Sequence, residues 1–148
     1  MNILIINGPN MNMLGKREPQ IYGEKSYEQL VRYIGSFCLE NKIDVSFFQS
    51  NHEGAIIDEI QRADGVFDGI VINPAGYSHT SVAIHDALKS VSVPAVEVHI
   101  SDVSLREEFR RIDIVSYACI NTVKGKGFDG YTEARELIER DIENEGRV

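Results

Sequence analysis

Hydrophobic and polar positions along this chain alternate between two patterns, one typical of β-strands and the other typical of amphipathic helices. Short apolar or alternating runs predict five strands, at residues 2–6, 43–49, 69–73, 95–100 and 114–123. Between them, apolar residues recur at helical spacing and predict helices at about 26–41, 55–63, 80–91 and 129–144, with a short one from 101 to 110. Strands that alternate with helices indicate an α/β fold with a parallel sheet covered on both faces.

The crossover connections predict the order of the strands. Right-handed crossovers favour a doubly wound, flavodoxin-like sheet of five strands in the order 2-1-3-4-5, formed by one domain over residues 1–148. Ligands of such sheets bind beyond the carboxyl ends of the strands. Polar residues follow the first four predicted strands at that edge: Asn7, Asn10, Ser50, Asn51, His52, Asn73, His79, His99, Ser101 and Arg106.

A long loop, residues 7–23, separates the first predicted strand from the first helix. Its glycines and prolines forbid a continuous helix, yet Met11 and Leu14 need something to pack on. A loop of this length inside a compact domain is usually functional or disordered. We therefore expect an active-site lid, with its mobile part at about 16–24, that carries Arg17 and Tyr22.

Composition limits the partners. The chain has 148 residues, 43% of them hydrophobic, and a formal net charge of −8, which argues against nucleic acid but leaves room for a small anionic substrate. The N-terminal apolar run is too short for a signal peptide, and no run reaches the length of a membrane span. Cys38 and Cys119 lack metal-ligand spacing, which predicts reduced thiols in a cytoplasmic protein.

Several side chains at the predicted edge suit acid–base chemistry, although each also has a structural interpretation. His79 lies in a polar loop and could act as an acid or base, or simply make a structural hydrogen bond. His99 follows Glu97 by two residues, an arrangement that orients an imidazole. An arginine near Tyr22 would favour its phenolate, and Arg17 is the nearest in sequence.

Two cations and a helix start could bind an anion. Arg106 and Arg110 are one helical turn apart, and Ser101 begins the short predicted helix, whose free N–H groups suit a carboxylate. A nucleotide- or flavin-binding module without catalysis remains an alternative, although the loop after the first strand lacks both glycine-rich phosphate motifs. An inactive subunit that only keeps the fold is a third interpretation.

The polar blocks, in their order, resemble those of type II 3-dehydroquinate dehydratases. The similar blocks are Asn7-Gly-Pro-Asn10 with Arg17-Glu-Pro19 and Tyr22-Gly23, Phe48-Gln-Ser-Asn-His-Glu-Gly54, Ile72-Asn-Pro74 with Ser78-His-Thr-Ser81, Glu97-Val-His-Ile-Ser101, Arg106-Glu-Glu-Phe-Arg110 and Gly130-Tyr131. The resemblance covers nearly the whole chain. It implies dehydration of 3-dehydroquinate to 3-dehydroshikimate without a cofactor, a metal or a Schiff-base lysine, by a homo-oligomer of trimers that form a dodecamer.

The same resemblance implies roles for single residues. Tyr22 is the expected base, with its phenolate favoured by Arg17. Asn10 would help to hold the enolate oxygen, and His79 would protonate the departing hydroxyl. The expected substrate-binding residues are Asn73, His99, Ile100, Ser101 and Arg110, supported by Glu97 and Arg106, and Asp86 is expected to reach the site of a neighbouring subunit.

The chain departs from the family pattern at four places, one of which is the last block, where Asn121 and Lys126 are unusual. Ala75-Gly76 reverses a more usual Gly-Ala order, so a tight bend at the first position would strain Ala75. Asp102 stands where Asn is common, and its charge would lower the affinity for an anion unless it points outward. Arg111-Ile-Asp113 replaces a run that more usually contains His and Ser.

Overall fold

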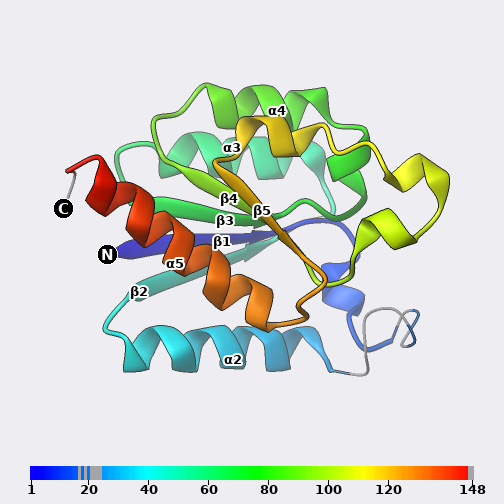
Figure 1. Cartoon of the computed structure of the whole chain (residues 1–148), viewed down its shortest axis with the longest axis horizontal. Coiled ribbons are helices and arrows are strands. Elements are labelled where there is room, and N and C mark those ends of the chain that lie inside the picture. Colours follow the sequence, from blue (N-terminus) through cyan, green and yellow to red (C-terminus); the bar gives the residue numbers. More distant parts are fainter. Residues whose placement is uncertain (17, 19, 21–24, 147–148) are drawn as a thin grey trace.

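The computed structural model describes residues 1–16, 18, 20 and 25–146 and contains one five-stranded parallel sheet (Figure 1). Its order is β2-β1-β3-β4-β5, which confirms the predicted flavodoxin-like topology. The strands are β1 (Asn2–Asn7), β2 (Asp44–Gln49), β3 (Gly69–Asn73), β4 (Ala95–His99) and β5 (Asn121–Lys124).

In the described part of the chain, four α-helices cover the two faces of the sheet. Helices α2 (Tyr27–Glu40) and α5 (Asp129–Asn144) lie on one face, and α3 (Glu53–Ala63) and α4 (Val82–Lys89) on the other (Figure 1). Each face has its own apolar core, so β1, β3 and β4 are buried on both sides. This explains why those strands read as nearly continuous apolar runs in the sequence.

Strand β4 shows how one strand serves both cores. Val96 and Val98 belong to the core under α2 and α5, and Ala95 belongs to the core under α3 and α4. Because side chains alternate along a strand, Glu97 and His99 share the face of Ala95. Both are fully or nearly fully buried, with exposed fractions of 0% and 4%. Two ionisable groups on an otherwise apolar strand need partners, because an unpaired buried charge is costly.

The start of α2 follows the sequence closely. Ser26 is the N-cap, and Gln29 completes a capping box with hydrogen bonds of 2.7 Å and 3.2 Å. The bounds of α5 also match the prediction. Helix α3 begins two residues earlier than predicted, at Glu53, and α4 is shorter than predicted because Ser81, not an earlier residue, caps it.

The prediction for residues 114–123 was wrong over most of its length. Only Asn121–Lys124 forms β5, and Val115–Ala118 forms a 3-10 helix, η5, so Cys119 and Ile120 lie before the strand. Asp113 causes the change, since its carboxylate accepts the backbone N–H of Ser116 at 3.1 Å. The Ser116 hydroxyl donates back to the Asp113 carbonyl at 2.6 Å. Such local bonds compete with a strand.

The single short helix predicted for 101–110 is two 3-10 turns. These are η3 (Val103–Leu105) and η4 (Glu108–Arg110), separated by extended backbone at Arg106 and Glu107. The Asp102 side chain caps η3 through Ser104, at 3.1 Å from its backbone nitrogen. Arg106 and Arg110 therefore do not share one α-helix, contrary to the prediction.

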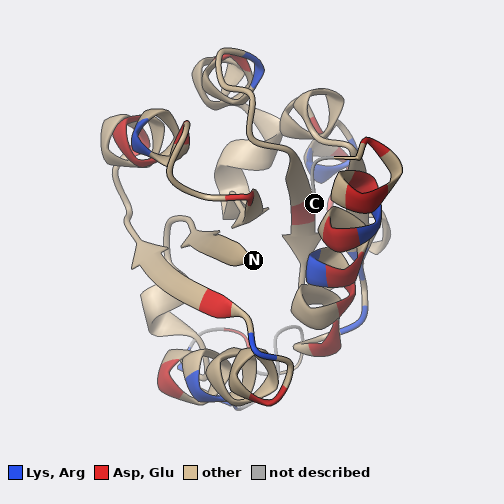
Figure 2. Ribbon diagram, turned by 90° about the vertical axis from the view of Figure 1, so that its left-hand side faces the viewer, with Lys and Arg blue, Asp and Glu red and all other residues tan. Residues whose placement is uncertain are grey.

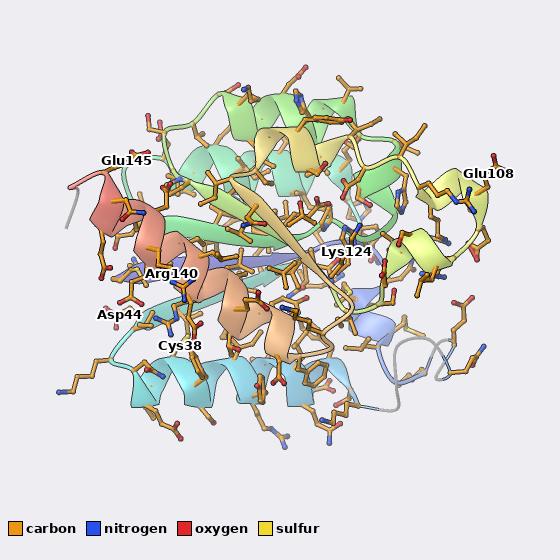
Figure 3. The ribbon with its side chains drawn as sticks, in the orientation of Figure 1. Cys38, Asp44, Glu108, Lys124, Arg140 and Glu145 are labelled. Atoms are coloured by element: carbon orange, nitrogen blue, oxygen red, sulfur yellow. The ribbon has the colours of Figure 1, made fainter. Side chains whose placement is uncertain are left out.

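Most of the charged residues lie along the helices and loops, and few lie on the strands (Figure 2). None of the helices in the described ranges is long and apolar enough to cross a membrane. Cys38 lies on the inner side of α2 (Figure 3), and it and Cys119 are free thiols whose pKa values are raised by burial. That agrees with the prediction of unreactive, reduced cysteines.

Candidate active site

A cavity of about 160 Å³ opens at the carboxyl edge of the sheet. Seven of the residues predicted to form the site line it: Asn10, Asn73, His79, Ile100, Ser101, Arg106 and Arg110. The other lining residues are Met11, Ala75, Gly76 and Val103. No carboxylate appears among these lining residues, although the chain carries a net charge of −8. The wall therefore suits an anionic ligand.

A larger hollow, of about 520 Å³, lies elsewhere. It runs along the outer side of α2 and is lined by Arg32, Tyr33, Phe128 and their neighbours. We place the chemistry in the smaller cavity because polar groups from the ends of β1, β3 and β4 converge there. Lys124 at the end of β5 marks the same edge in Figure 3, and Glu108 lies further out on η4.

The turn after β1 is joined to the end of β3. Gly8 donates its backbone N–H to the Asn73 carbonyl at 2.8 Å. A Cβ atom at Gly8 would lie 2.7 Å from the carbonyl oxygen of Pro74, so this close approach requires glycine. Asn10 has a left-handed backbone with a φ of 70°, and its N–H donates to the Asn51 side chain at 2.9 Å. The turn thus holds Asn10 on the cavity wall.

A buried hydrogen-bond network fixes the two asparagines at the strand ends. The phenol of Tyr131, on α5, donates to the Asn7 side-chain oxygen at 2.5 Å and accepts from the Asn73 amide at 3.1 Å. Burial raises the pKa of Tyr131, which keeps the phenol protonated as a donor. In the sequence, Tyr131 belongs to a block that resembles the family, but no role in the site was predicted for it. The signal in the sequence that could have revealed this role is the tyrosine hydroxyl, because a buried tyrosine needs a hydrogen-bond partner.

Ala75 occupies a strained position directly beside the site. Its φ is +52°, in the region that favours glycine, while Gly76 has no such angle and has open space around its missing Cβ. The bend is held on both sides, because Ala75 N–H donates to the Asn73 side chain at 3.1 Å and Ser78 donates to the Ala75 carbonyl at 2.8 Å. The reversed Ala-Gly order therefore does strain Ala75, as predicted.

His79 ends the 3-10 turn η2 (Ala75–His79) and is half-buried on the cavity wall. Its Nδ1 atom lies 2.7 Å from the carbonyl oxygen of Ile112. Because a carbonyl can only accept, Nδ1 must carry the hydrogen, which leaves Nε2 as the nitrogen that gains and loses a proton. The neighbouring backbone is tied to the same segment by a 2.8 Å bond from Ile114 N–H to the Ser78 carbonyl.

Behind His79, the buried His99 is held between two carboxylates. Its Nε2 atom lies 3.0 Å from Glu97 Oε1 and 3.6 Å from Asp113 Oδ2. The two histidine rings are nearly parallel, with centroids 6.5 Å apart. Thr122 donates to the second oxygen of Glu97 at 3.4 Å. Asp113 was not predicted as a site residue, and its only signal was the departure from the family pattern at that position.

The proximity of these three groups shifts all three pKa values. Burial alone would lower the pKa of His99, but Asp113 and Glu97 outweigh it and raise that pKa to about 9. Burial raises the pKa of Glu97 to about 7, although His99 opposes the change. Burial would raise the pKa of Asp113, but its bonds to His99 and Glu97 lower it. The direction of these shifts favours an imidazolium at His99 beside an ionised Asp113 at neutral pH.

The same three residues are the set in the described ranges that could hold a metal ion, with ligand atoms within 4.8 Å of one another. Their geometry already has a different explanation, since the Nε2 hydrogen of His99 lies between the carboxylates. A cation would have to displace that proton. The sequence-based expectation of no metal and no cofactor stays a prediction.

The two arginines of the cavity each have a carboxylate partner outside its wall. Arg106 Nη2 lies 3.2 Å from Glu18 Oε2, and Arg110 pairs with Glu107. The arginine at 110 lowers the pKa of Glu107. Asp102 does not line the cavity, because its carboxylate is turned to Ser104, which lowers its pKa. The doubt that Asp102 raised about anion binding is thereby removed.

Three further predicted residues, Glu97, His99 and Asp86, do not line this cavity. Arg17 and Tyr22 lie outside the described residues, as does most of the predicted lid. Glu97 and His99 are almost fully buried, each at most 4% exposed. Asp86 is exposed on α4, where it bonds to His85 at 2.8 Å, and does not reach the cavity of its own chain.

Comparisons with known proteins agree with this arrangement. The model of the family described as dehydroquinase class II matches residues 1–139. A 3-dehydroquinate dehydratase from Thermotoga petrophila is 50% identical over 143 residues, which cover 97% of this chain and 98% of that protein.

Solved structures extend the comparison to the fold. A type II dehydroquinase from Butyrivibrio crossotus superposes with a TM-score of 0.92 at 52% identity, covering 94% of this chain and 97% of the other. The type II dehydroquinase from Propionibacterium acnes gives a TM-score of 0.88 at 39% identity, covering 93% and 96%.

Proposed function

Because this chain belongs to the class II dehydroquinase family, we propose that it is a lyase that dehydrates 3-dehydroquinate to 3-dehydroshikimate in the shikimate or quinate pathway. The observation that carries the proposal is the cavity at the carboxyl edge. Its described lining residues include two arginines and a histidine whose Nδ1–H is fixed by a carbonyl, and no carboxylate. This is what acid-assisted loss of a hydroxyl from an anionic substrate requires.

The reaction divides into two proton transfers. A base removes the proton next to the ketone, which leaves an enolate, and Tyr22 as its phenolate, favoured by Arg17, is the proposed base. The enolate then expels the hydroxyl at its β carbon as the new carbon–carbon double bond forms. His79 Nε2 gives its proton to the departing oxygen, so that water leaves. Asn10 helps to hold the enolate oxygen, as an oxyanion site does.

The bond from His79 to Ile112 suits this role of an acid. While Nε2 loses its proton, Nδ1 keeps its hydrogen bond of 2.7 Å to the carbonyl, so the ring does not have to turn. An imidazolium is also stabilised by donating to a carbonyl oxygen. Removal of the proton therefore changes one end of the ring only.

The remaining polar groups are proposed to hold the substrate. Asn73, Ser101 and Arg110 line the cavity, as do the backbone groups of Ile100, and they would bind the carboxylate and hydroxyl groups. His99 would donate from its second nitrogen, with Glu97 behind it. Arg106 adds positive charge to the wall. The proposed lid at about 16–24 would close over these groups and deliver Arg17 with Tyr22.

We further propose that the protein acts as a homo-oligomer in the cytoplasm, with trimers that assemble into a dodecamer. The support is an apolar surface at the exposed Leu105, Phe109, Ile112 and Tyr117, which are 65–82% exposed in the single chain. Large apolar side chains that stay this exposed in a single chain become covered when they form part of an interface. Asp86, exposed on α4, would then approach a neighbour's cavity.

A nucleotide- or flavin-binding module is not favoured. The turn after β1 is occupied by its contact with Asn73 and Pro74, which leaves no glycine-rich cradle for a phosphate there. The family match also covers residues 1–139, nearly the full chain.

The direct test is to add 3-dehydroquinate to the purified protein and follow the absorbance of the conjugated enone product. We expect turnover that is lost in His79→Ala and kept in His85→Ala, because His85 lies on α4 outside the cavity. Borohydride added with substrate should not inactivate the enzyme, since no imine forms. No turnover across a broad pH range would refute the proposal.

A further inference from the structure

Two adjacent residues, Ile112 and Asp113, contact both histidines at the active site. The carbonyl of Ile112 binds His79 Nδ1 at 2.7 Å, and the carboxylate of Asp113 lies 3.6 Å from His99 Nε2. Three further bonds lock this dipeptide in place. Ser116 donates its backbone N–H to the Asp113 carboxylate at 3.1 Å and its hydroxyl to the Asp113 carbonyl at 2.6 Å. Ile114 donates its backbone N–H to the Ser78 carbonyl at 2.8 Å. The segment is therefore a rigid support for both rings.

We propose that Asp113 is a positioning residue that, together with Glu97, holds His99 as a protonated ring that can only donate hydrogen bonds to the ligand. The geometry carries the argument. Both carboxylates approach the same nitrogen, Nε2, so that this nitrogen must bear a hydrogen. A second carboxylate adds an attraction that one alone would not supply.

The surroundings of His99 favour the charged ring. The ionisable groups that face it are Glu97 on its own strand, Asp113, His79 from η2, and Cys119 before β5, while Lys124 is its neighbour on β5. Cys119 is held neutral because burial raises the pKa of its thiol. The two carboxylates therefore favour the charged ring of His99, and the one lysine that disfavours it is exposed and well solvated.

The protonation state decides what His99 can recognise. A neutral imidazole has one donor and one acceptor, and an imidazolium has two donors. With Nε2 committed to the carboxylates, Nδ1–H faces away from them and makes no hydrogen bond to another described residue. It would then bind an oxygen lone pair, which the hydroxyl and carboxylate groups of the substrate offer. This step rests on the proposed function.

Asp113→Asn is the informative change. Asparagine keeps the side-chain oxygen that accepts the Ser116 N–H, so η5 keeps its cap, but the negative charge next to His99 is lost. Asp102→Asn is the matched control, since it removes an equal charge from a capping aspartate turned to Ser104, away from His99. Asp113→Glu keeps the negative charge, so its His99 pKa should stay close to that of the wild type.

The first measurement needs no substrate. NMR titration of ¹⁵N-labelled histidine rings, with His99 identified by His99→Gln, should show the His99 pKa falling by about one unit or more in Asp113→Asn. It should stay unchanged in Asp102→Asn. An unchanged His99 pKa in Asp113→Asn would overturn the proposal, whether or not the protein turns over 3-dehydroquinate.

The second measurement uses turnover. At pH 9, where the wild-type ring is about half protonated, a pKa lower by one unit reduces the protonated fraction about fivefold, so Asp113→Asn should raise KM about fivefold. The value of kcat should change far less, and KM at pH 6 should be close to that of the wild type. An equal loss of kcat at every pH would indicate a merely structural role and would contradict the proposal.

Discussion

The phenol of Tyr131 donates a 2.5 Å hydrogen bond to the side chain of Asn7, a residue 124 positions earlier in the chain. The same oxygen accepts from Asn73 at 3.1 Å. One hydroxyl on α5 thus ties together the ends of β1 and β3, the two strands whose loops carry Asn10 and His79. The position of the catalytic loops depends on the last helix.

Tyr131→Phe should destabilise the protein by about 1–3 kcal/mol, because it leaves two buried amide groups without their partner. It should also raise KM, since Asn73 loses the bond that fixes its amide. Urea unfolding and turnover would measure the two effects. Tyr33→Phe is the control, because that phenol bonds to Asp129 on the exposed surface. Equal stability losses in both variants would argue against the network.

Exchanging the order of Ala75 and Gly76 should stabilise the fold. Ala75→Gly relieves a left-handed backbone that costs a non-glycine residue about 1–2 kcal/mol. Gly76→Ala fits open space and removes about 0.4–1 kcal/mol of entropy from the unfolded chain. We expect the double variant to be about 1 kcal/mol more stable by denaturant titration. If Gly76→Ala alone were destabilising, the assigned backbone at that residue would be wrong.

The stability of the protein should fall between pH 7 and 9. The folded protein holds the His99 proton up to a pKa of about 9, whereas an unfolded histidine releases it near 6.5. The stabilisation is complete below pH 6.5 and is lost as the pH rises through 9. The expected slope is about 1.4 kcal/mol per pH unit in this window. For His99→Gln, the free energy of unfolding measured in urea should depend less on pH over the same range. If its pH dependence ran parallel to that of the wild type, His99 would not be the origin of the slope.

The lid residue Glu18 should affect substrate binding through Arg106. Their ion pair, at 3.2 Å, joins the predicted lid to the cavity wall. Glu18 is largely exposed, so Glu18→Gln should change stability by less than about 1 kcal/mol. It should change KM more than kcat. Glu108→Gln, on the outer rim, is the control, and identical kinetics in the two variants would show that the contact has no role.

Tyr22→Phe tests the proposed base, which lies outside the described residues. Loss of the phenol should lower kcat by about 10²-fold or more and leave binding of a substrate analogue largely intact. Calorimetric titration together with the enone assay separates the two. Full activity of this variant would remove Tyr22 as the base, even if the overall reaction is confirmed.

Periodicity and the crossover rule were sufficient for the sheet order and for the edge where polar residues gather. They brought Asn10, Asn73 and His79 to the edge where the cavity lies, because the carboxyl ends of parallel strands meet at one edge, but the helix predicted to align Arg106 with Arg110 is absent from the described residues. They failed at 114–120, since an aspartate followed by a serine three residues on made a local turn inside an apolar run. Pattern rules count apolar residues and do not weigh such bonds.

The support of the histidines could not be read from the sequence. Asp113 lies 14 residues beyond His99, and Tyr131 lies 58 beyond Asn73, so neither spacing marks a contact. Only the packing of η5 and α5 against the strands brings these groups together. The family resemblance supplied the roles of single residues, but not the carboxylate that this chain places beside His99.

The cavity wall without carboxylates has a consequence for the kinetics of encounter. An anion approaching from afar meets the field of a protein with a net charge of −8 and is repelled, while at the wall it meets Arg106 and Arg110. Added salt screens the distant field first, because the Debye length is about 30 Å at 0.01 M and about 10 Å at 0.1 M. Moderate ionic strength therefore speeds association, and only higher ionic strength weakens binding, which gives a maximum in kcat/KM.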